Sequence, residues 1–549
     1  MNGSGPIIRY VALVIALAVV AAMLDRMRFG IDFTDEAFYV ALPFRFALGD
    51  RPFIDELNVT QTGALLLYPF VKAYVWVKGG ASGIFLFIRV LYVCFFGAVG
   101  WATFTLASRF VPRPAALLLG AACVCFIPYG IPGLSYNTLS AGLLTIGLCL
   151  AVCGLLEAPP RRRVHRDTLF WAGVAHATAA LAYPSVVVAT VPTAAAIFAL
   201  AAGRRPRAVG SYALGGLAFA ALSSPVFLQA GVSQLRHVVA YSSQAISSDM
   251  NRAPMLLDAF LAQHPQLWRS LAIIAVAVIA ARRHPLLVGI ASPAIPLLAR
   301  GSVGAPIVAN MNYLSCFALF GPLFYLGMND RRAARVLLFC GWLPPLFAAA
   351  AMGWSSGNGI VASGLAMYAS AIFSALMLSI WLSDTAKRWT WTWLRAPATL
   401  APAVVALELL RSVLGDDAFY REEPRKALTA KVAEGPYKGL FTSPRRKAWL
   451  AGVTADIRAH AKGERALFFY DFPAGYLIAN KRPNVSSAWI FPFAQRSVDD
   501  ARFFQERAAP GELVMRLNGH HPPMPLDAPV KSRTTPIGQR DGYRLDVVR

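Results

Sequence analysis

Three acids close together in the sequence are the first residues that could do chemistry. Asp32, Asp35 and Glu36 lie in the stretch Gly30–Gly49, directly after an apolar segment that starts near the N-terminus. A carboxylate in such a place can act as a general base and take a proton from a hydroxyl group. A structural role is also open, because acids favour the first turn of a helix, where Asp32 or Thr34 could be the cap. Adjacent helical residues diverge by about 100°, so Asp35 and Glu36 cannot serve the same atom.

The composition places these acids in a membrane protein. Of the 549 residues, 56% are hydrophobic and only 15% are charged, and the mean hydropathy is +0.50. These values lie far from those of soluble domains. The net charge of +23 is concentrated in short clusters between apolar runs, so we expect no nucleic-acid partner. All seven cysteines fall in apolar segments, which predicts core residues and no metal site.

The apolar segments predict an all-α polytopic membrane protein with about 13 transmembrane helices, each of roughly 20 residues or fewer. The expected spans are approximately residues 7–24, 84–107, 114–130, 134–156, 168–183, 185–201, 208–230, 266–281, 286–299, 312–327, 335–352, 359–382 and 397–411. The loops alternate between basic clusters, such as Arg161–Arg163, and mostly neutral stretches, such as Gly353–Gly359. By the positive-inside rule the N-terminus is cytoplasmic and residues 412–549 are extracytoplasmic.

The chain is expected to form two domains. Residues 1–411 form the predicted transmembrane domain. Within it, residues 25–83 are a first extracytoplasmic loop with helices at the membrane surface over 35–48 and 63–77. Residues 412–549 have the composition of a soluble α/β domain. Its predicted elements are a helix over 444–460 and strands over 466–470, 512–517 and 543–548.

The first loop carries a resemblance to a known family. An apolar anchor, then Phe33-Thr-Asp-Glu-Ala-Phe-Tyr39, then surface helices, many spans and an external domain resembles the GT-C superfamily of polyprenyl-phosphate-dependent glycosyltransferases. Within that superfamily the layout is similar to that of protein O-mannosyltransferases and bacterial aminoarabinose transferases. The resemblance implies a plasma (inner) membrane enzyme that moves a sugar from a polyprenyl-phosphate donor to an acceptor hydroxyl, with inversion. It implies that Asp35 is the catalytic base, with Glu36 as the next candidate.

The group that binds the donor phosphate is less evident. Relatives that modify lipid A carry a Lys-Pro pair further along this loop, where this chain has Asn58–Gly63. By predicted side, the candidate substitutes are Arg45, Arg236, His237, Tyr241 and Arg300. Each could instead be a surface or lipid-headgroup residue, and a bound divalent ion could stabilise the phosphate in their place.

Further candidates for substrate binding are Gln61 in that region and Tyr136 and Asn137 in a short external connection, which could equally be a turn with a capping residue. The acceptor could be a glycan, a lipid or a protein, and membrane lipids must surround the spans. A lipid-linked glycan transporter or an assembly scaffold without catalysis is the alternative. Whether Asp35 lies near a cavity open to the lipid distinguishes these functions.

Overall fold

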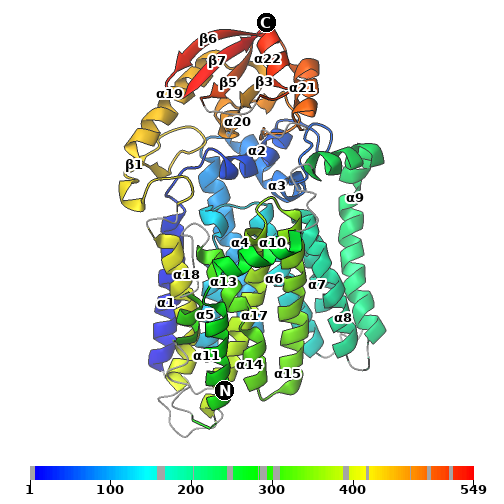
Figure 1. Ribbon diagram of the computed structural model, residues 1–549, viewed down its shortest axis with the longest axis vertical. Coiled ribbons are helices and arrows are strands. Elements are labelled where there is room, and N and C mark those ends of the chain that lie inside the picture. The colour runs from blue at the N-terminus through cyan, green and yellow to red at the C-terminus, as the bar shows by residue number, and fades with distance from the viewer. Residues whose placement is uncertain are drawn as a thin grey trace.

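The computed structural model describes residues 6–157, 167–201, 203, 205–243, 252–281, 283–284, 294–300, 309–387, 395–415, 419–469, 472–490, 496–518 and 523–549. It is a long bundle of helices with a small sheet region at one end (Figure 1). The first loop lies between the two.

The helices of the bundle follow the predicted apolar segments. They are α1 (Pro6–Arg26), α4 (Ile84–Ala107), α5 (Arg113–Val124), α6 (Tyr136–Leu156), α7 (Thr168–Ala182), α8 (Thr190–Leu200), α9 (Arg205–Ser243), α10 (Arg252–Gln263), α11 (Leu267–Ala280), α13 (Ala309–Ala318), α14 (Gly321–Gly327), α15 (Arg331–Val336), α16 (Leu343–Ser355), α17 (Ile360–Lys387) and α18 (Arg395–Leu414). Short 3₁₀ helices, η1 (Pro128–Gly130) and η3 (Pro184–Ala189), precede α6 and α8, and a π-helical segment, η5 (Leu337–Trp342), joins α15 to α16.

Six helical stretches within the described residues are long and apolar enough to cross a membrane: α1, α4, α6, α9, the continuous stretch from α15 to α16, and α17. The chain is therefore an integral membrane protein. Shorter apolar helices, among them α5, α7 and α11, lie beside them. The prediction of about 13 spans is not confirmed, and most of the expected span at 286–299 lies outside the described residues.

Helix α9 is longer than its predicted span of 208–230. A left-handed backbone at Gly231 (φ 76°) bends it, so its last turns lie across the end of the bundle (Figure 1). There Gln234 donates to the carbonyl of Phe53 (2.8 Å), and the Ser242 hydroxyl accepts from the amide of Val59 (2.8 Å). The bend thus connects a membrane helix to the first loop.

Two glycines let α7 and α9 approach closely. A Cβ atom on Gly173 would overlap the carbonyl of Tyr212, and one on Gly215 would overlap the carbonyl of Phe170. Small residues at helix crossings are a usual device of membrane bundles. The buried His176 on α7 is 2.7 Å from the Tyr212 hydroxyl on α9, so this residue joins the two helices.

The first loop contains α2 (Asp35–Ala47) and α3 (Gln61–Lys78), close to the predicted bounds. Helix α3 has an exposed apolar face that includes Phe70 and Trp76, as expected of a helix at the membrane surface. Helix α2 is different, because it is buried from Glu36 to Phe46 between the bundle and the C-terminal region (Figure 1). Helix α2 is therefore enclosed by protein, unlike α3, and its place at the membrane surface stays a prediction.

The C-terminal region confirms the predicted mixture of helices and strands. Its helices are α19 (Pro444–His460), α20 (Ala474–Ala479), α21 (Arg496–Arg507) and α22 (Asp527–Arg533), with η7 (Arg425–Ala427) before them. Its strands are β1 (Ala430–Lys431), β2 (Phe441–Thr442), β3 (Lys462–Phe469), β4 (Arg482–Pro483), β5 (Glu512–Leu517), β6 (Thr534–Arg540) and β7 (Tyr543–Val548). Strands β1 and β2 form an antiparallel pair. The main sheet has the order β4-β3-β5-β7-β6, in which β3 is parallel to β4 and β5 and the other pairs are antiparallel.

Candidate active site

Asp32 organises the start of α2. Its carboxylate accepts from the amide and the hydroxyl of Thr34 (3.1 and 2.7 Å) and from the amide of Glu36 (2.7 Å). Burial raises the pKa of Asp32, and these hydrogen bonds oppose that rise. Asp32 therefore accepts from one of the free N–H groups of the first helical turn, that of Glu36, and from the amide just before the helix, so this capping does not depend on Asp35.

Glu36 forms a buried ion pair with Arg89 of α4. Its two carboxylate oxygens accept from Nε and Nη2 of Arg89, both at 2.6 Å. The same guanidinium also donates to the carbonyls of Met27 and Gly30, both at 2.9 Å. Both side chains are almost completely buried. Glu36 is thus placed as a structural residue that ties α2 to the bundle, rather than as a second base.

Asp35 differs from Glu36 in its exposure and in its hydrogen-bond partner. It is half-buried, and the hydroxyl of Tyr420 donates a hydrogen bond to its Oδ2 at 2.5 Å. Tyr420 belongs to the linker, by which we mean residues 419–422 between α18 and β1. It stands 385 positions after Asp35 in the chain. The sequence alone gave no sign of this contact.

Five tyrosines form a group that begins around Asp35 and extends away from it through ring contacts. We call this group the tyrosine cluster: Tyr39, Tyr129, Tyr136, Tyr183 and Tyr420. The Tyr39 and Tyr136 rings meet edge to face at 5.4 Å, and the Tyr136 and Tyr183 rings lie 5.5 Å apart. Tyr129 holds an unusual left-handed backbone (φ 57°). Burial, together with neighbouring groups that include Asp35, raises the pKa of Tyr39 and of Tyr129.

A polar pocket of about 350 Å³ adjoins the tyrosine cluster. Its lining residues are Asn58, Val59, Thr60, Tyr136, Ala182, Tyr183, Pro184, Ser185, Val239, Ser242, Ser243, Ser355, Ser356, Gly357 and Asn358. Tyr136 and Tyr183 of the tyrosine cluster are among these lining residues. The tyrosine cluster therefore connects Asp35 to a pocket rich in hydroxyl and amide groups. None of these lining residues is Arg, Lys or His.

An apolar groove of about 680 Å³ adjoins the polar pocket and lies between α7, α8 and α9. Pro184 lines both spaces. Small and apolar side chains line the groove, among them Ala177, Val191, Leu217 and Phe227. Val191 and Leu217 are exposed on the outside of the bundle. In a membrane protein, such a groove faces the lipid tails.

Arg45, a predicted phosphate ligand, is enclosed instead by acids of its own loop. Its guanidinium donates to Asp50 (2.9 Å), Glu56 (2.5 Å) and the carbonyl of Asp55 (2.7 Å), and it is 1% exposed. Burial lowers the pKa of Arg45, but the carboxylates of Asp50 and Glu56 outweigh burial and hold it above its usual value. These contacts give Arg45 a structural role and leave it no route to a phosphate.

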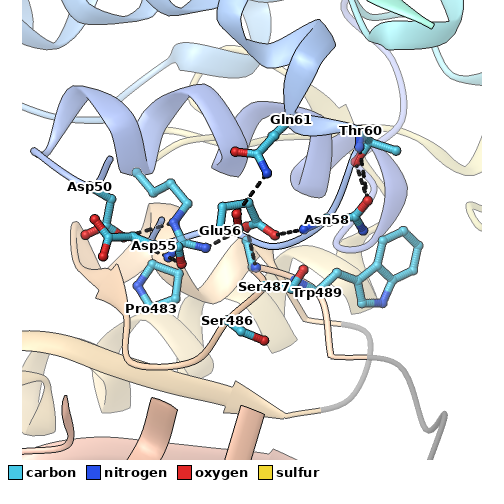
Figure 2. Close-up of polar contacts among 12 residues, drawn as sticks. Asp50, Asp55, Glu56, Asn58, Thr60, Gln61, Pro483, Ser486, Ser487 and Trp489 are labelled. Carbon is cyan, nitrogen blue, oxygen red and sulfur yellow. Dashed lines mark hydrogen bonds and ion pairs between the residues drawn. The ribbon is translucent and has the colours of Figure 1, made fainter. Parts of the chain in front are cut away.

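The same acids tie the loop to the C-terminal region, and we call the set Arg45, Asp50, Asp55, Glu56, Arg465 and Arg507 the loop–domain ion network. Asp50 pairs with Arg465 and Asp55 pairs with Arg507, both at 2.9 Å. Glu56 accepts from the amide of Ala488 (3.1 Å). Figure 2 shows Glu56 between Gln61 of α3 and Ser487 of the C-terminal region.

Gln61, a predicted substrate-binding residue, supports this network. Its amide group donates to the carbonyl of Glu56 (2.8 Å) and accepts from the amide of Phe53 (2.6 Å), and its side chain is fully buried. The other two predicted substrate-binding residues lie near Asp35. Tyr136 lines the polar pocket, and the Asn137 amide donates to the Tyr39 hydroxyl (3.3 Å). The nearby Ser135 caps α6, as one prediction had it.

The remaining predicted phosphate ligands do not line the polar pocket. On α9, Arg236 is exposed, His237 is 3.0 Å from Asp499, and Tyr241 is buried against Phe53 and Leu57 of the first loop. Arg300 pairs with Glu408 of α18 at 3.5 Å. Helix α9 does contribute to the pocket, but through Val239, Ser242 and Ser243. In the described part of the chain, no group of three or more His, Cys, Asp or Glu side chains could hold a metal ion.

Several solved structures are similar to this chain over most of its length. ArnT from Cupriavidus metallidurans, crystallised with undecaprenyl phosphate, has 15% identity and a TM-score of 0.44 over 98% of this chain and 97% of its own. The oligosaccharyltransferase of Archaeoglobus fulgidus, tethered with an acceptor peptide, has 12% identity and a TM-score of 0.48 over 92% and 69%. The same enzyme, AglB, in complex with an inhibitory peptide and a dolichol-phosphate, has 12% identity and a TM-score of 0.41 over the same shares.

ArnT and AglB are GT-C glycosyltransferases that use polyprenyl-phosphate-linked donors, the class that the sequence resemblance named. At these identities the likeness concerns the fold. No protein-family model and no curated protein matches the sequence.

Sequence reasoning missed Tyr129, Tyr183 and Tyr420, and also Ser355 and Ser356 at the end of α16. A weak signal was available, because Tyr129 and Ser355 stand in or beside loops that the charge pattern had placed on the same side as Asp35. Polar residues at the ends of apolar runs on that side were therefore candidates. Nothing in the sequence ranked them above other surface residues.

Proposed function

We propose that the protein transfers a sugar from a polyprenyl-phosphate donor to an acceptor hydroxyl at the external face of the membrane, with inversion. The observation that carries this proposal is a succession of neighbouring features. Tyr420 of the tyrosine cluster bonds to Asp35, Tyr136 and Tyr183 of the same cluster line the polar pocket, and Pro184 lines both that pocket and the apolar groove. A carboxylate near a polar pocket that adjoins an apolar groove suits a substrate with a polar head and a hydrocarbon tail.

In this proposal the polyprenyl chain occupies the apolar groove. A cavity of about 680 Å³ lined by small and aliphatic side chains holds part of such a chain, and the rest lies in the bilayer. Burial of hydrocarbon stabilises binding but does not select the sugar. Pro184, which lines both spaces, then marks where the chain ends and the phosphate begins.

The phosphate and the sugar occupy the polar pocket and the space beside the tyrosine cluster. Hydroxyl and amide donors of Ser185, Ser355 and Asn358 can hydrogen bond to phosphate oxygens. Stabilising the departing phosphate is the main electrostatic demand of the reaction. Neutral donors therefore take the place of the cation that the sequence had led us to expect.

Asp35 acts as the general base of this reaction. The acceptor hydroxyl gives its proton to the carboxylate while its oxygen attacks the anomeric carbon. The bond between that carbon and the phosphate oxygen breaks, and the polyprenyl phosphate leaves with the electron pair. One attack on the opposite face inverts the anomeric configuration. Glu36 does not take part, because Arg89 holds both of its oxygens.

A transfer assay on the purified full-length protein tests the proposal. It uses a panel of radiolabelled polyprenyl-phosphate sugars with three acceptor classes: hydroxyl-bearing lipids, glycans and peptides. We expect release of polyprenyl phosphate and labelling of one acceptor class, and loss of both in Asp35→Asn. If no donor is consumed but the protein moves intact donor across the bilayer of proteoliposomes, the chain is a transporter and the proposal is wrong.

A further inference from the structure

The Tyr420 contact with Asp35 joins two distant parts of the chain at the site. The hydroxyl of Tyr420 lies 2.5 Å from Oδ2 of Asp35, within the range of short hydrogen bonds to a carboxylate. Burial, followed by the charge of Asp35, raises the pKa of Tyr420. The phenol therefore stays protonated and is the donor in this bond.

The position of Tyr420 is fixed by other contacts of the linker. On one side, the ring of Phe419 lies 3.8 Å from the guanidinium of Arg26. On the other side, the carboxylate of Glu422 accepts from the amide of Ile31 (3.0 Å) and from the hydroxyl of Thr442 (2.7 Å). These bonds anchor the linker to the loop before α2. The ring of residue 420 is therefore held beside Asp35 whether or not it carries a hydroxyl group.

Groups from several elements lie around Asp35. Among them are Thr34 of its own loop, Tyr39 of α2, Tyr129 of η1, Tyr136 of α6 and Tyr420 of the linker, and the charged groups of Asp32 and Arg421 act on Tyr420 beside it. Asp32 is an acid, and its negative charge favours protonation of a neighbouring carboxyl. Arg421, whose guanidinium lies 5.2 Å from the centre of the Tyr420 ring, has the opposite effect.

We infer that Tyr420 is a positioning residue that holds the Asp35 carboxylate in one orientation and keeps it ionised, ready to take the proton of the acceptor. This inference rests on the proposed function, in which Asp35 is the base. A hydrogen bond to the charged form of a carboxylate stabilises that form. The linker supplies the Tyr420 hydroxyl, a group that the membrane helices do not provide. The part of the chain that follows α18 thereby contributes to the site.

The variant Tyr420→Phe removes the hydroxyl and keeps the ring. The acid limb of its pH–rate profile should move to higher pH by about one unit, because a bond to a charged group is lost. Tyr437→Phe is the matched control. Tyr437 donates to the carbonyl of Asp32 (2.6 Å), so its variant loses a hydroxyl bond to the same loop but not to Asp35. Its acid limb should stay within a few tenths of a unit of the wild type.

A second readout does not depend on activity. Carbodiimide reacts with protonated carboxyl groups, so mass spectrometry of the peptide that contains Asp35 reports its titration in the full-length protein. In Tyr420→Phe, labelling of Asp35 should persist to about one pH unit higher than in the wild type or in Tyr437→Phe. The inference is overturned if the Tyr420→Phe labelling curve matches the wild type, or if Tyr437→Phe shifts as far. Full turnover in Asp35→Asn would instead refute the proposed function, whatever the labelling curves show.

Discussion

The loop–domain ion network and the tyrosine cluster differ in the partners that they give to acids of the first loop. In the loop–domain ion network, Asp50 and Glu56 are fully buried and face the guanidinium of Arg45, so their charges are balanced inside the protein. In the tyrosine cluster, Asp35 is half-buried and receives a phenol hydroxyl. A neutral donor orients a carboxylate without cancelling its charge. The comparison suggests that the first cluster holds the fold and that the second is available for chemistry.

The largest effect that separates the clusters is expected for Asp35→Asn. Asparagine keeps the shape and the acceptor oxygen but has no useful basicity, so transfer should fall by roughly 10² to 10⁴, equivalent to about 3 to 5 kcal/mol of barrier. Stability should hardly change, since Asp32 makes the capping bonds. Turnover and melting temperature measured on the same preparation check both statements. Near-normal turnover in this variant would remove Asp35 from the mechanism.

The reverse pattern is expected for Glu56→Gln. The change leaves Arg45 buried with one carboxylate fewer, and breaking a buried ion pair costs about 3 to 5 kcal/mol of stability. The melting temperature should fall strongly, while the folded fraction keeps its turnover per molecule. Glu464→Gln is the control, because Glu464 pairs with Arg482 at the exposed edge of the same region and such pairs contribute at most about 1 kcal/mol. Equal losses in both variants would show that the network is not a buried support.

A smaller effect is expected where α7 and α9 cross beside the apolar groove. Gly215→Ala places a methyl group against the carbonyl of Phe170, so the helices must separate, at a cost of about 1 to 3 kcal/mol. Donor binding should weaken because the groove changes shape, whereas the pH profile set by Asp35 should not move. Gly210→Ala, on the same helix with no atom within 4 Å of its new methyl group, should be neutral. Unchanged donor affinity in Gly215→Ala would place the lipid tail elsewhere.

Elements with strong local signals could be predicted from the sequence. The apolar run of α4 has the predicted bounds of 84–107, and α19, β5 and β7 also begin and end where the pattern placed them. Each of these segments carries its own periodicity and its own stop signals. The burial of α2 could not be predicted in this way, because it depends on a sheet region formed more than 400 residues later.

The residues of the candidate site also differ in whether the local sequence indicated them. Asp35 and Tyr136 stand in short stretches whose residue types already indicated function. Arg45 was chosen for its charge and its predicted side, but the sequence could not show that Asp50 and Glu56 fold back onto it. Tyr420 has no local signal at all. Its contact with Asp35 exists only because the linker returns from α18 to the loop before α2.

The last expected effect depends on pH and concerns Asp500 of α21, a third kind of acid in the comparison. It is fully buried like Glu56, but its Oδ1 accepts from the amide (3.2 Å) and the hydroxyl (2.5 Å) of Ser486. Within the described residues its Oδ2 has no hydrogen-bond partner. Burial raises the pKa of Asp500 to about 7, from 3.8 for an unperturbed group. At a pH between these two pKa values, Asp500 therefore keeps its proton in the folded protein but has lost it in the unfolded chain.

Stability must then fall as the pH rises from about 4 to about 7, by at most about 1.4 kcal/mol per pH unit, and this group adds no further loss above that range. Asp500→Asn keeps the acceptor oxygen for Ser486 and removes the titration. Between pH 5 and pH 7 the melting temperature of the wild type should fall, and that of Asp500→Asn should fall by a few degrees less. Both are measured in scans at one heating rate. Asp541→Asn, a change at an exposed acid, should follow the wild-type curve. Parallel curves for all three proteins would mean that Asp500 is ionised in the fold, and that a buried acid in this region can stay charged on hydroxyl and amide donors alone.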